Sequence, residues 1–271
     1  MFYMRRGIII SMKMSITQRI LNKGLAARYK SPSQKIRVLT ESWVGREIYC
    51  PSCGAGVNRY EHNRPVADFY CPVCEEEYEL KSKGDGIGRK VVDGAYKAMI
   101  ERLKGNHNPN LFLLAYDLQN YEVLNFFAVP KYFFVPEIIE KRKPLSQFAR
   151  RAGWIGCNII LHNIPQAGKI FYIQNKVVLP KTAILKSWQK TLFLKKEPKT
   201  TERGWTLDIM NCLDNLCKKE FLLEEVYDFE KELKTRHPRN LHIKDKIRQQ
   251  LQILRDNGYL EFLGRGNYRL V

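Results

Sequence analysis

Four cysteines arranged in two Cys-x2-Cys pairs constrain the fold of this chain more than any other feature. Cys50 and Cys53 form the first pair, and Cys71 and Cys74 form the second pair after 17 intervening residues. This spacing is typical of a tetrahedral zinc site with four thiolate ligands. Four thiolates leave no open position for a substrate. The sequence therefore predicts one structural Zn²⁺ per chain, which clamps two short extended segments together.

Redox chemistry is the alternative use of these cysteines, because each pair also has the Cys-x-x-Cys form. Neither pair lies between a strand and a helix, which is the setting of a thioredoxin-type site, and we therefore favour zinc. The chain has seven cysteines. With four assigned to zinc, Cys157, Cys212 and Cys217 are expected to stay reduced, which favours a cytoplasmic location.

Three polar residues flank the second cysteine pair and mark a candidate active site. Asp68 precedes Cys71 by three residues, and Glu79 follows Cys74 by five. Polar and apolar residues alternate over positions 78–81, so Glu79 and Lys81 share one face of a strand. A Glu-x-Lys triplet alone is weak evidence, since it recurs twice in this chain and a solvated ion pair explains those copies. The neighbouring zinc site and Asp68 distinguish this copy.

The charge of the chain indicates a polyanionic partner. The formal net charge is +18, which favours nucleic acid over an anionic membrane surface because no strongly amphipathic basic helix stands out. Residues 201–271 carry a net charge of +1, so the preceding 200 residues carry +17. No apolar run approaches the length needed to span a bilayer, and residues 1–14 lack a signal-peptide core. We expect no membrane contact.

The first 200 residues have the pattern of an α/β domain. A helix is expected over residues 34–49, and Asp93 is expected to cap a second helix that ends at Gly105. A further helix is expected after Pro136. Residues 177–199 are rich in lysine and are expected to form a connector without a buried strand. Strands are expected over 110–116, 122–129 and 169–173.

The last 70 residues have the pattern of a winged helix, three helices followed by a β-hairpin. The hairpin is expected over 259–263 and 267–270, with Arg265 at its tip. The expected helices span 205–216, 222–233 and 243–257. Apolar residues at helical spacing predict the buried face of the third helix: Ile243, Ile247, Leu251 and Leu254.

The opposite face of this third helix carries side chains that can read DNA bases. Arg248, Gln249 and Gln252 lie there together with Asp245. In the major groove, arginine recognises guanine and glutamine recognises adenine through pairs of hydrogen bonds. The third helix is therefore the expected recognition helix, and Arg265 is expected to reach a phosphate or the minor groove. A winged helix used for protein contact is the alternative.

Four segments of the chain resemble the DpnI-type methyl-directed restriction endonucleases. The resemblance runs from about Tyr29 to the C-terminus. The segments are RPVADFYC (64–71), ELKSK (79–83), ARRAGWIGCN (149–158) and IKDKIRQQLQILR (243–255). Residues 1–28 fall outside the clear match and form an N-terminal extension, with Met12 and Met14 as alternative starts.

The resemblance implies a PD-(D/E)xK restriction-endonuclease-like domain with a four-cysteine zinc site, joined to a C-terminal winged helix. We expect the nuclease domain over 29–183, a basic linker over 184–200 and the winged helix over 201–271. The implied activity is that of a type II restriction endonuclease. Its implied substrate is double-stranded DNA with methylated adenine in GATC, and we expect the enzyme to be a monomer.

The resemblance also assigns the catalytic residues. Asp68 and Glu79 would hold catalytic Mg²⁺, while Lys81 would orient the attacking water and help to deprotonate it. Pro65 is not adjacent to Asp68, which departs mildly from the family motif. Glu41, on the first expected helix, is a candidate further acidic member.

Trp154 is the candidate for recognition of the methyl group in the nuclease domain. A methyl group on the adenine amine is a small apolar group in the major groove, and an aromatic face can cover it. Arg150 and Arg151 flank Trp154 in the matching segment and are further expected DNA contacts. On residue type alone, a purely structural role for Trp154 is an equal alternative.

Two rival functions use part of this set of features. A zinc-containing transcriptional regulator would need the winged helix and the basic charge, but not Asp68, Glu79 and Lys81 together. A repair or recombination nuclease would need those three residues, but not a winged helix that reads bases.

Overall fold

The computed structural model describes residues 2–5, 8–11, 15–61, 66–105, 107–197 and 199–271. The alternative starts at Met12 and Met14, and Arg64 and Pro65 of the family segment, lie outside these residues. A central sheet of seven strands has the order β12-β11-β8-β7-β5-β4-β3, in which β5 and β7 are parallel and the other neighbours are antiparallel. The strands are β3 (Asn58–Arg59), β4 (Phe69–Tyr70), β5 (Glu77–Gly84), β7 (Asn110–Tyr116), β8 (Val123–Val129), β11 (Ile170–Gln174) and β12 (Val177–Val178). A separate hairpin pairs β1 (Phe2–Arg5) with β2 (Ile8–Ser11).

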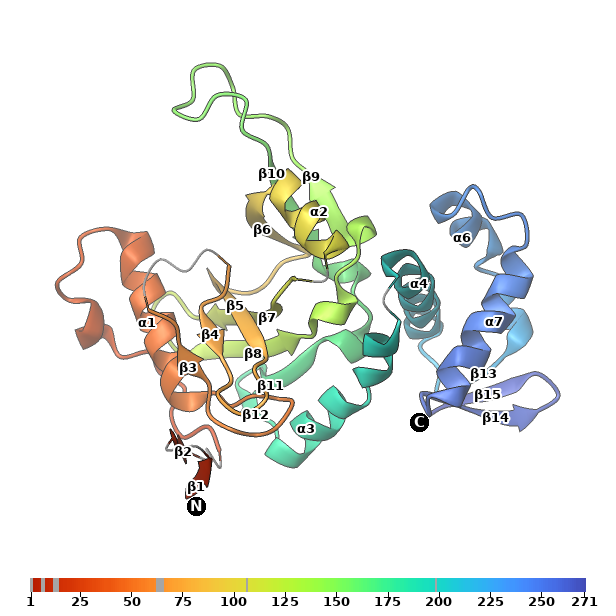
Figure 1. The fold of residues 1–271 in the computed structure, drawn as a ribbon, viewed down its shortest axis with the longest axis horizontal. Helices are drawn as coiled ribbons and strands as arrows, with labels where there is room; N and C mark the ends of the chain where they lie inside the picture. The colour runs from red at the N-terminus through yellow and green to blue at the C-terminus, as the bar shows by residue number, and fades with distance from the viewer. Residues whose placement is uncertain (1, 6–7, 12–14, 62–65, 106, 198) are drawn as a thin grey trace.

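The sheet separates two hydrophobic clusters because side chains alternate along its strands. In β7, Phe112 and Leu114 belong to the cluster under helices α1 and α3, whereas Leu111 and Leu113 belong to the cluster that includes α2. All seven residues of β7 are buried, as expected for a central strand covered on both faces. The three helices are α1 (Pro32–Glu47), α2 (Tyr96–Lys104) and α3 (Lys181–Gln189) (Figure 1).

A second, three-stranded sheet with the order β6-β10-β9 lies beside α2 (Figure 1). Its strands are β6 (Lys90–Ala95), β9 (Ile139–Lys141) and β10 (Gly156–Ile160). Two expectations from the sequence are wrong here. Asp93 lies within β6 opposite Cys157, and α2 begins only at Tyr96. The helix expected after Pro136 is not formed. A short 3-10 turn leads into β9 instead, and Ile139 of β9 pairs with Ile159 of β10.

The lysine-rich segment 177–199 is part of the core around the central sheet, which differs from the connector expected from the sequence. It contains α3, and Ile184 and Trp188 of this helix are almost fully buried. Both belong to the cluster that includes α1. Of the two lysines of α3, Lys186 is exposed and Lys181 donates a hydrogen bond to the Gly54 carbonyl at 2.8 Å. The lysine-rich composition of the segment hid its apolar stripe.

The last part of the chain is a winged helix, as the sequence predicted. A three-stranded sheet with the order β13-β15-β14 packs beside the helices, and the second expected helix is divided at Asp228–Phe229. The elements are α4 (Thr200–Leu216), β13 (Glu220–Leu222), α5 (Leu223–Tyr227), α6 (Glu230–Arg236), α7 (Ile243–Asp256), β14 (Leu260–Gly264) and β15 (Asn267–Leu270). The four apolar positions predicted for the third helix are all buried in α7.

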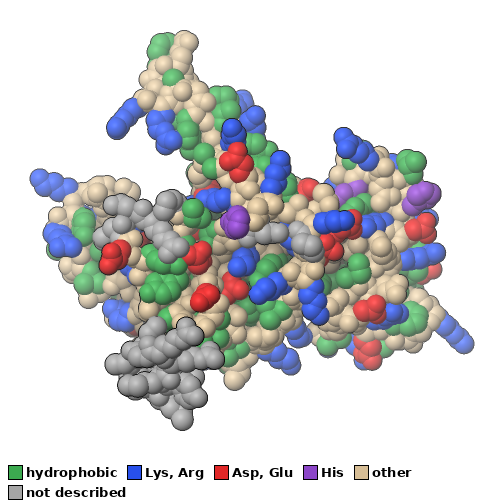
Figure 2. Space-filling view, in the orientation of Figure 1, with side chains coloured by type: hydrophobic (Ala, Val, Ile, Leu, Met, Phe, Trp, Pro, Cys, Tyr) green, Lys and Arg blue, Asp and Glu red, His purple; other side chains and the backbone are tan. Residues whose placement is uncertain are grey.

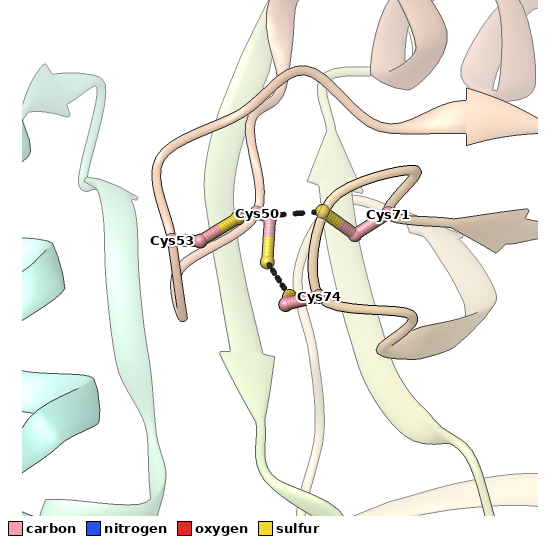
Figure 3. A group of neighbouring side chains, drawn as sticks. All are labelled: Cys50, Cys53, Cys71 and Cys74. Carbon is pink, nitrogen blue, oxygen red and sulfur yellow. Dashed lines mark hydrogen bonds between the residues drawn. The ribbon is translucent and has the colours of Figure 1, made fainter. Parts of the chain in front are cut away.

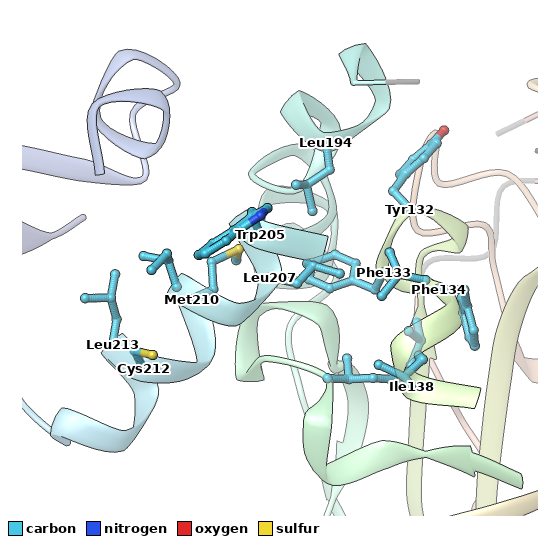
Figure 4. Packing of buried hydrophobic residues seen from close by; sticks show 14 of the residues in the cluster. Tyr132, Phe133, Phe134, Ile138, Leu194, Trp205, Leu207, Met210, Cys212 and Leu213 are labelled. Atoms are coloured by element: carbon cyan, nitrogen blue, oxygen red, sulfur yellow. The ribbon is translucent and has the colours of Figure 1, made fainter. Parts of the chain in front are cut away.

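Helix α4 joins the winged helix to the part of the chain that contains the central sheet. Leu207 of α4 and Phe133 belong to one continuous cluster of buried residues that also includes the core of the winged helix (Figure 4). Two hydrogen bonds between α4 and the segment 163–166 add to this contact: Gln166 N–H donates to Asp214 Oδ2 at 2.7 Å, and Asn211 Nδ2 donates to Asn163 O at 2.7 Å. None of the helices in the described residues is long and apolar enough to cross a bilayer.

Candidate active site, zinc centre and DNA-binding surfaces

The two cysteine pairs form knuckles with the same backbone geometry. In each knuckle, the residue four positions after the first cysteine has a positive φ, +79° at Gly54 and +61° at Glu75. Its N–H donates to the carbonyl oxygen of that cysteine, at 2.8 Å in the first knuckle and 3.0 Å in the second. This tight turn brings both sulfurs of a pair to one side of the backbone.

The four sulfurs form a cluster of the size that Zn²⁺ requires. All four ligand atoms lie within 4.8 Å of one another, and Cys50–Cys74 and Cys53–Cys71 are each separated by 3.4 Å (Figure 3). Tetrahedral coordination with Zn–S bonds of about 2.3 Å places sulfurs about 3.8 Å apart. The predicted four-cysteine site is therefore confirmed as a cluster that can bind zinc. The hydroxyl of Tyr78 lies 3.1 Å from Cys50 Sγ and closes one side of it.

The zinc centre fixes the strands that carry the candidate catalytic residues. Its second knuckle connects β4 directly to β5. Asp68 lies immediately before β4, and its N–H donates to the Tyr78 carbonyl at 2.9 Å. The Asp68 carboxylate accepts a 2.7 Å hydrogen bond from the N–H of Leu80. The structure thus attaches Asp68 to the backbone between Glu79 and Lys81, although these residues are 11 and 13 positions away in the sequence.

Lys81 lies between two carboxylates. Its Nζ is 2.5 Å from Glu79 Oε1 and 2.8 Å from Asp93 Oδ1. Glu79 and Lys81 share one face of β5, as the alternation in the sequence predicted. Asp93 comes from β6, a strand of the small three-stranded sheet. Arg102 of α2 approaches Asp93 Oδ2 at 3.8 Å. The cluster therefore contains two acids and two bases.

The electrostatics of the cluster keep Lys81 protonated. Burial lowers the pKa of Lys81, but the negative charges of Glu79 and Asp93 outweigh this effect and the pKa is raised. Burial raises the pKa of Glu79 against the opposing charge of Lys81. For Asp93, burial is outweighed by Lys81 and the pKa is lowered. Burial also raises the pKa of Asp68.

A cleft of about 940 Å³ opens beside these residues. Asp68 and Lys81 line it, and so does Glu41 of α1, which forms ion pairs with Arg37 and Arg59. Glu79 is not among the residues that line the cleft, but it contacts Lys81, which does line it. Among the described strands, β4 pairs with β5 only at Glu77 and Tyr78, so the edge of β5 beyond these residues remains open toward the cleft. An extended polyanion can approach the candidate catalytic residues along this edge.

Asp93 is the acidic member of this cluster that the sequence did not reveal, and Arg102 was not foreseen either. The Asp93 side chain is only 3% exposed, and its ion pair with Lys81 is shorter than that with Arg102. In the sequence, Asp93 stands before a predicted helix and has the form of an N-cap. The preceding Val91 and Val92 are β-branched and favour a strand, which is the local signal for the strand assignment.

The expected base-reading side chains of α7 point outward. Arg248, Gln249 and Gln252 are exposed, whereas Gln250 is buried and accepts a hydrogen bond from the Thr206 hydroxyl at 2.6 Å. The Arg248 guanidinium also contacts the Tyr227 hydroxyl. Arg265 has a positive φ of +49° and is exposed at the hairpin tip.

The expected DNA contacts of the nuclease part lie on the segment between β9 and β10. Arg150 and Arg151 are exposed, and the Arg151 guanidinium lies 4.6 Å from the centre of the Trp154 ring. Trp154 is half-buried, and its ring lies against Gly156. One face of Trp154 is therefore covered by a cation in this arrangement.

Comparison with protein families agrees with both parts of the chain. Residues 17–197 match the family described as DpnI, the Dam-replacing family, and residues 201–270 match the Dam-replacing HTH domain. These matches imply a restriction nuclease that binds DNA through a helix-turn-helix domain. Since the two matches cover most of the sequence, the chain belongs to the DpnI (Dam-replacing) family.

Proposed function

We propose that this protein is a type II, methyl-directed restriction endonuclease. It hydrolyses phosphodiester bonds of double-stranded DNA at GATC sites that carry methylated adenine. The observation that carries the proposal is the convergence of Asp68, Glu79 and Lys81 at the open edge of β5, in a chain of the DpnI family. The four-cysteine centre supports this arrangement because it fixes the connection between β4 and β5.

The carboxylates suit a catalytic Mg²⁺. Mg²⁺ is usually held by one or two carboxylates together with waters and substrate phosphates. Asp68 and Glu79 provide two hard oxygen donors whose side chains are 26% and 20% exposed. When bound, Mg²⁺ would polarise the scissile phosphate and stabilise charge on the leaving oxygen.

Lys81 supplies the positive charge of the site. Because its pKa is raised, it enters the reaction as a protonated amine. We propose that it orients the attacking water and neutralises the phosphate, and that proton removal by Lys81 requires the pairing with Glu79 and Asp93 to change first. Asp93 holds Lys81 in position.

The two DNA-binding surfaces read the target together. In the winged helix, Arg248, Gln249 and Gln252 contact base edges, and Arg265 contacts the backbone. In the nuclease part, Arg150 and Arg151 contact phosphates, and Trp154 covers the methyl group once Arg151 moves from its face. We further propose that the enzyme acts as a cytoplasmic monomer with two functional units divided near residue 200.

Cleavage of plasmid DNA separates this function from its rivals. We expect cleavage of Dam-methylated plasmid with Mg²⁺, and none of unmethylated plasmid or without Mg²⁺. Asp68→Ala should abolish cleavage and retain DNA binding, because Asp68 would hold the metal. Cleavage of both plasmids would indicate a repair nuclease, and specific binding without any cleavage would indicate a regulator. Full turnover by Asp68→Ala would remove Asp68 from the active site.

A further inference from the structure

A protruding arm, residues 142–155, connects β9 to β10 and projects from the body of the molecule (Figures 1 and 2). Hydrogen bonds across its base continue the pairing of the two strands. Arg142 N–H donates to Gly156 O at 3.0 Å, and Leu145 N–H donates to Trp154 O at 2.9 Å. The arm is therefore a built extension of the small sheet, with a defined direction.

The arm combines one exposed aromatic side chain with a high density of positive charge. Phe148 is 90% exposed, the highest value among the large apolar side chains that the structure shows as exposed. Residues 141–156 contain no Asp or Glu. They contain five cations: Lys141, Arg142, Lys143, Arg150 and Arg151.

The surroundings of Phe148 determine what can cover it. Single exposed apolar residues are common on protein surfaces and need no partner. Phe148 differs because it stands on a projecting arm whose charges all attract a polyanion, which disfavours an apolar protein surface as its partner. Trp154, the other aromatic residue of the arm, is already engaged by Arg151. Phe148 is thus the aromatic side chain that the arm presents to solvent.

We propose that Phe148 is a wedge that inserts between two base pairs of bound duplex DNA, while the cations of the arm hold the adjacent phosphates. Apolar side chains that insert at a base step partially unstack it and kink the duplex. The arm extends from the same small sheet whose β6 lines the cleft, so one duplex could contact both the cleft and the arm. The inference rests on the proposed function, since duplex DNA must be the substrate.

Fluorescence of 2-aminopurine tests the insertion directly. A set of duplexes with one methylated GATC site would carry the probe at successive positions within and beside the site. Mg²⁺ is omitted rather than chelated, so that DNA is not cut and the four-cysteine centre keeps its metal. The full chain is compared with Phe148→Ala, Phe148→Trp and the control Val177→Ala, which removes a 62% exposed side chain from the far edge of the central sheet.

We expect emission to rise at one step with the unaltered chain, with Phe148→Trp and with Val177→Ala, but not with Phe148→Ala. Affinity measured by anisotropy should fall by about 5- to 150-fold for Phe148→Ala, the range for loss of one base–aromatic stack. Its salt dependence should be unchanged because every cation remains. The thermal unfolding temperature should also be unchanged, since the exposed side chain of Phe148 buries little surface in the folded protein.

Each contrary result has a definite meaning. If the unaltered chain binds methylated duplex but emission stays flat at every position, the wedge is wrong and the proposed nuclease function stands. Insertion is also overturned if Phe148→Ala loses affinity while 2-aminopurine emission does not rise with the unaltered chain. Phe148 would then contact the wall of a DNA groove. If the unaltered chain does not bind the duplex at all, the proposed function fails together with the wedge.

Discussion

Lys81 contacts two carboxylates, and only one of them belongs to the Glu-x-Lys triplet. Asp93 lies on a different strand, β6. Its negative charge is a second partner for Lys81, which would otherwise pair with Glu79 alone. Glu79 would bind Mg²⁺ and could then no longer pair with Lys81. Asp93 would remain as a fixed partner of Lys81. Asp93 is therefore a positioning residue for Lys81.

Asp93→Asn should lower the rate of cleavage by about 10- to 100-fold, the usual cost of losing a group that orients a metal-site residue. DNA binding should change little, because Asp93 is buried away from solvent. Single-turnover cleavage and anisotropy separate the two effects. Glu220→Gln, which alters an exposed acid paired with Arg269, is the control. Unaltered cleavage by Asp93→Asn would show that Glu79 alone positions Lys81.

At the scale of elements, two short backbone motifs and one helix determine the functional geometry. The paired knuckles hold β4 against β5, and so place Asp68 beside Leu80. Helix α7 separates its residues by periodicity, with an apolar face inside and a polar face outside. The Cys-x2-Cys spacing sets the direction of the sulfurs, and the helical period sets which side chains of α7 are buried. Both are short repeats in the sequence.

Zinc removal should destabilise the nuclease part, because the metal would link the two knuckles through Cys50, Cys53, Cys71 and Cys74. We expect one zinc per chain by elemental analysis. Cys71→Ser should lower the Tm by at least about 5 °C and abolish cleavage. Cys217→Ser, at an exposed cysteine after α4, should leave both unchanged. A folded and active preparation without zinc would contradict a structural role.

Substitutions on α7 should affect specific binding more than nonspecific binding. Arg248→Ala or Gln249→Ala should weaken binding to methylated GATC by about 1–3 kcal/mol if each makes a good pair of base contacts. Arg255→Ala is the matched control. It removes an exposed cation from the C-terminal end of the same helix, whereas recognition helices use their N-terminal residues. Equal losses on specific and scrambled duplexes would reduce the winged helix to a nonspecific tether.

At the scale of the whole molecule, α4 belongs to both units. One buried cluster extends from the core of the winged helix through Leu207 to Phe133 in the nuclease part. The winged helix is consequently docked on the nuclease part rather than tethered to it. Most of the net positive charge lies in the first 200 residues, so the nuclease part is expected to dominate the salt dependence of binding.

The shared core predicts that both units unfold together. Calorimetry should show one transition, and Leu207→Ala should destabilise the whole chain by about 2–5 kcal/mol, as for other large-to-small changes in a core. Leu241→Ala, at an 80% exposed position, provides a control with the same change of side chain. Two separated transitions in the unaltered protein would show that the contact through α4 is weak.

The sequence by itself determined the features that depend on short repeats. The spacing of Cys50 to Cys74 predicted the metal cluster, and the alternation around Glu79 and Lys81 predicted their common face. The 3.6-residue period predicted the buried face of α7. These features could be predicted because each depends on residues close together in the chain, where backbone geometry alone fixes their relative positions.

Only the tertiary structure decided the rest. Asp93 has the sequence context of a helix cap, but pairing of β6 with β10 places it in a strand beside Lys81. Trp188 lies in a lysine-rich segment, yet packing against the central sheet buries it. Phe148 is exposed because β9 and β10 pair at the base of its arm. Each outcome depends on the pairing or packing of distant segments, which local propensity does not encode.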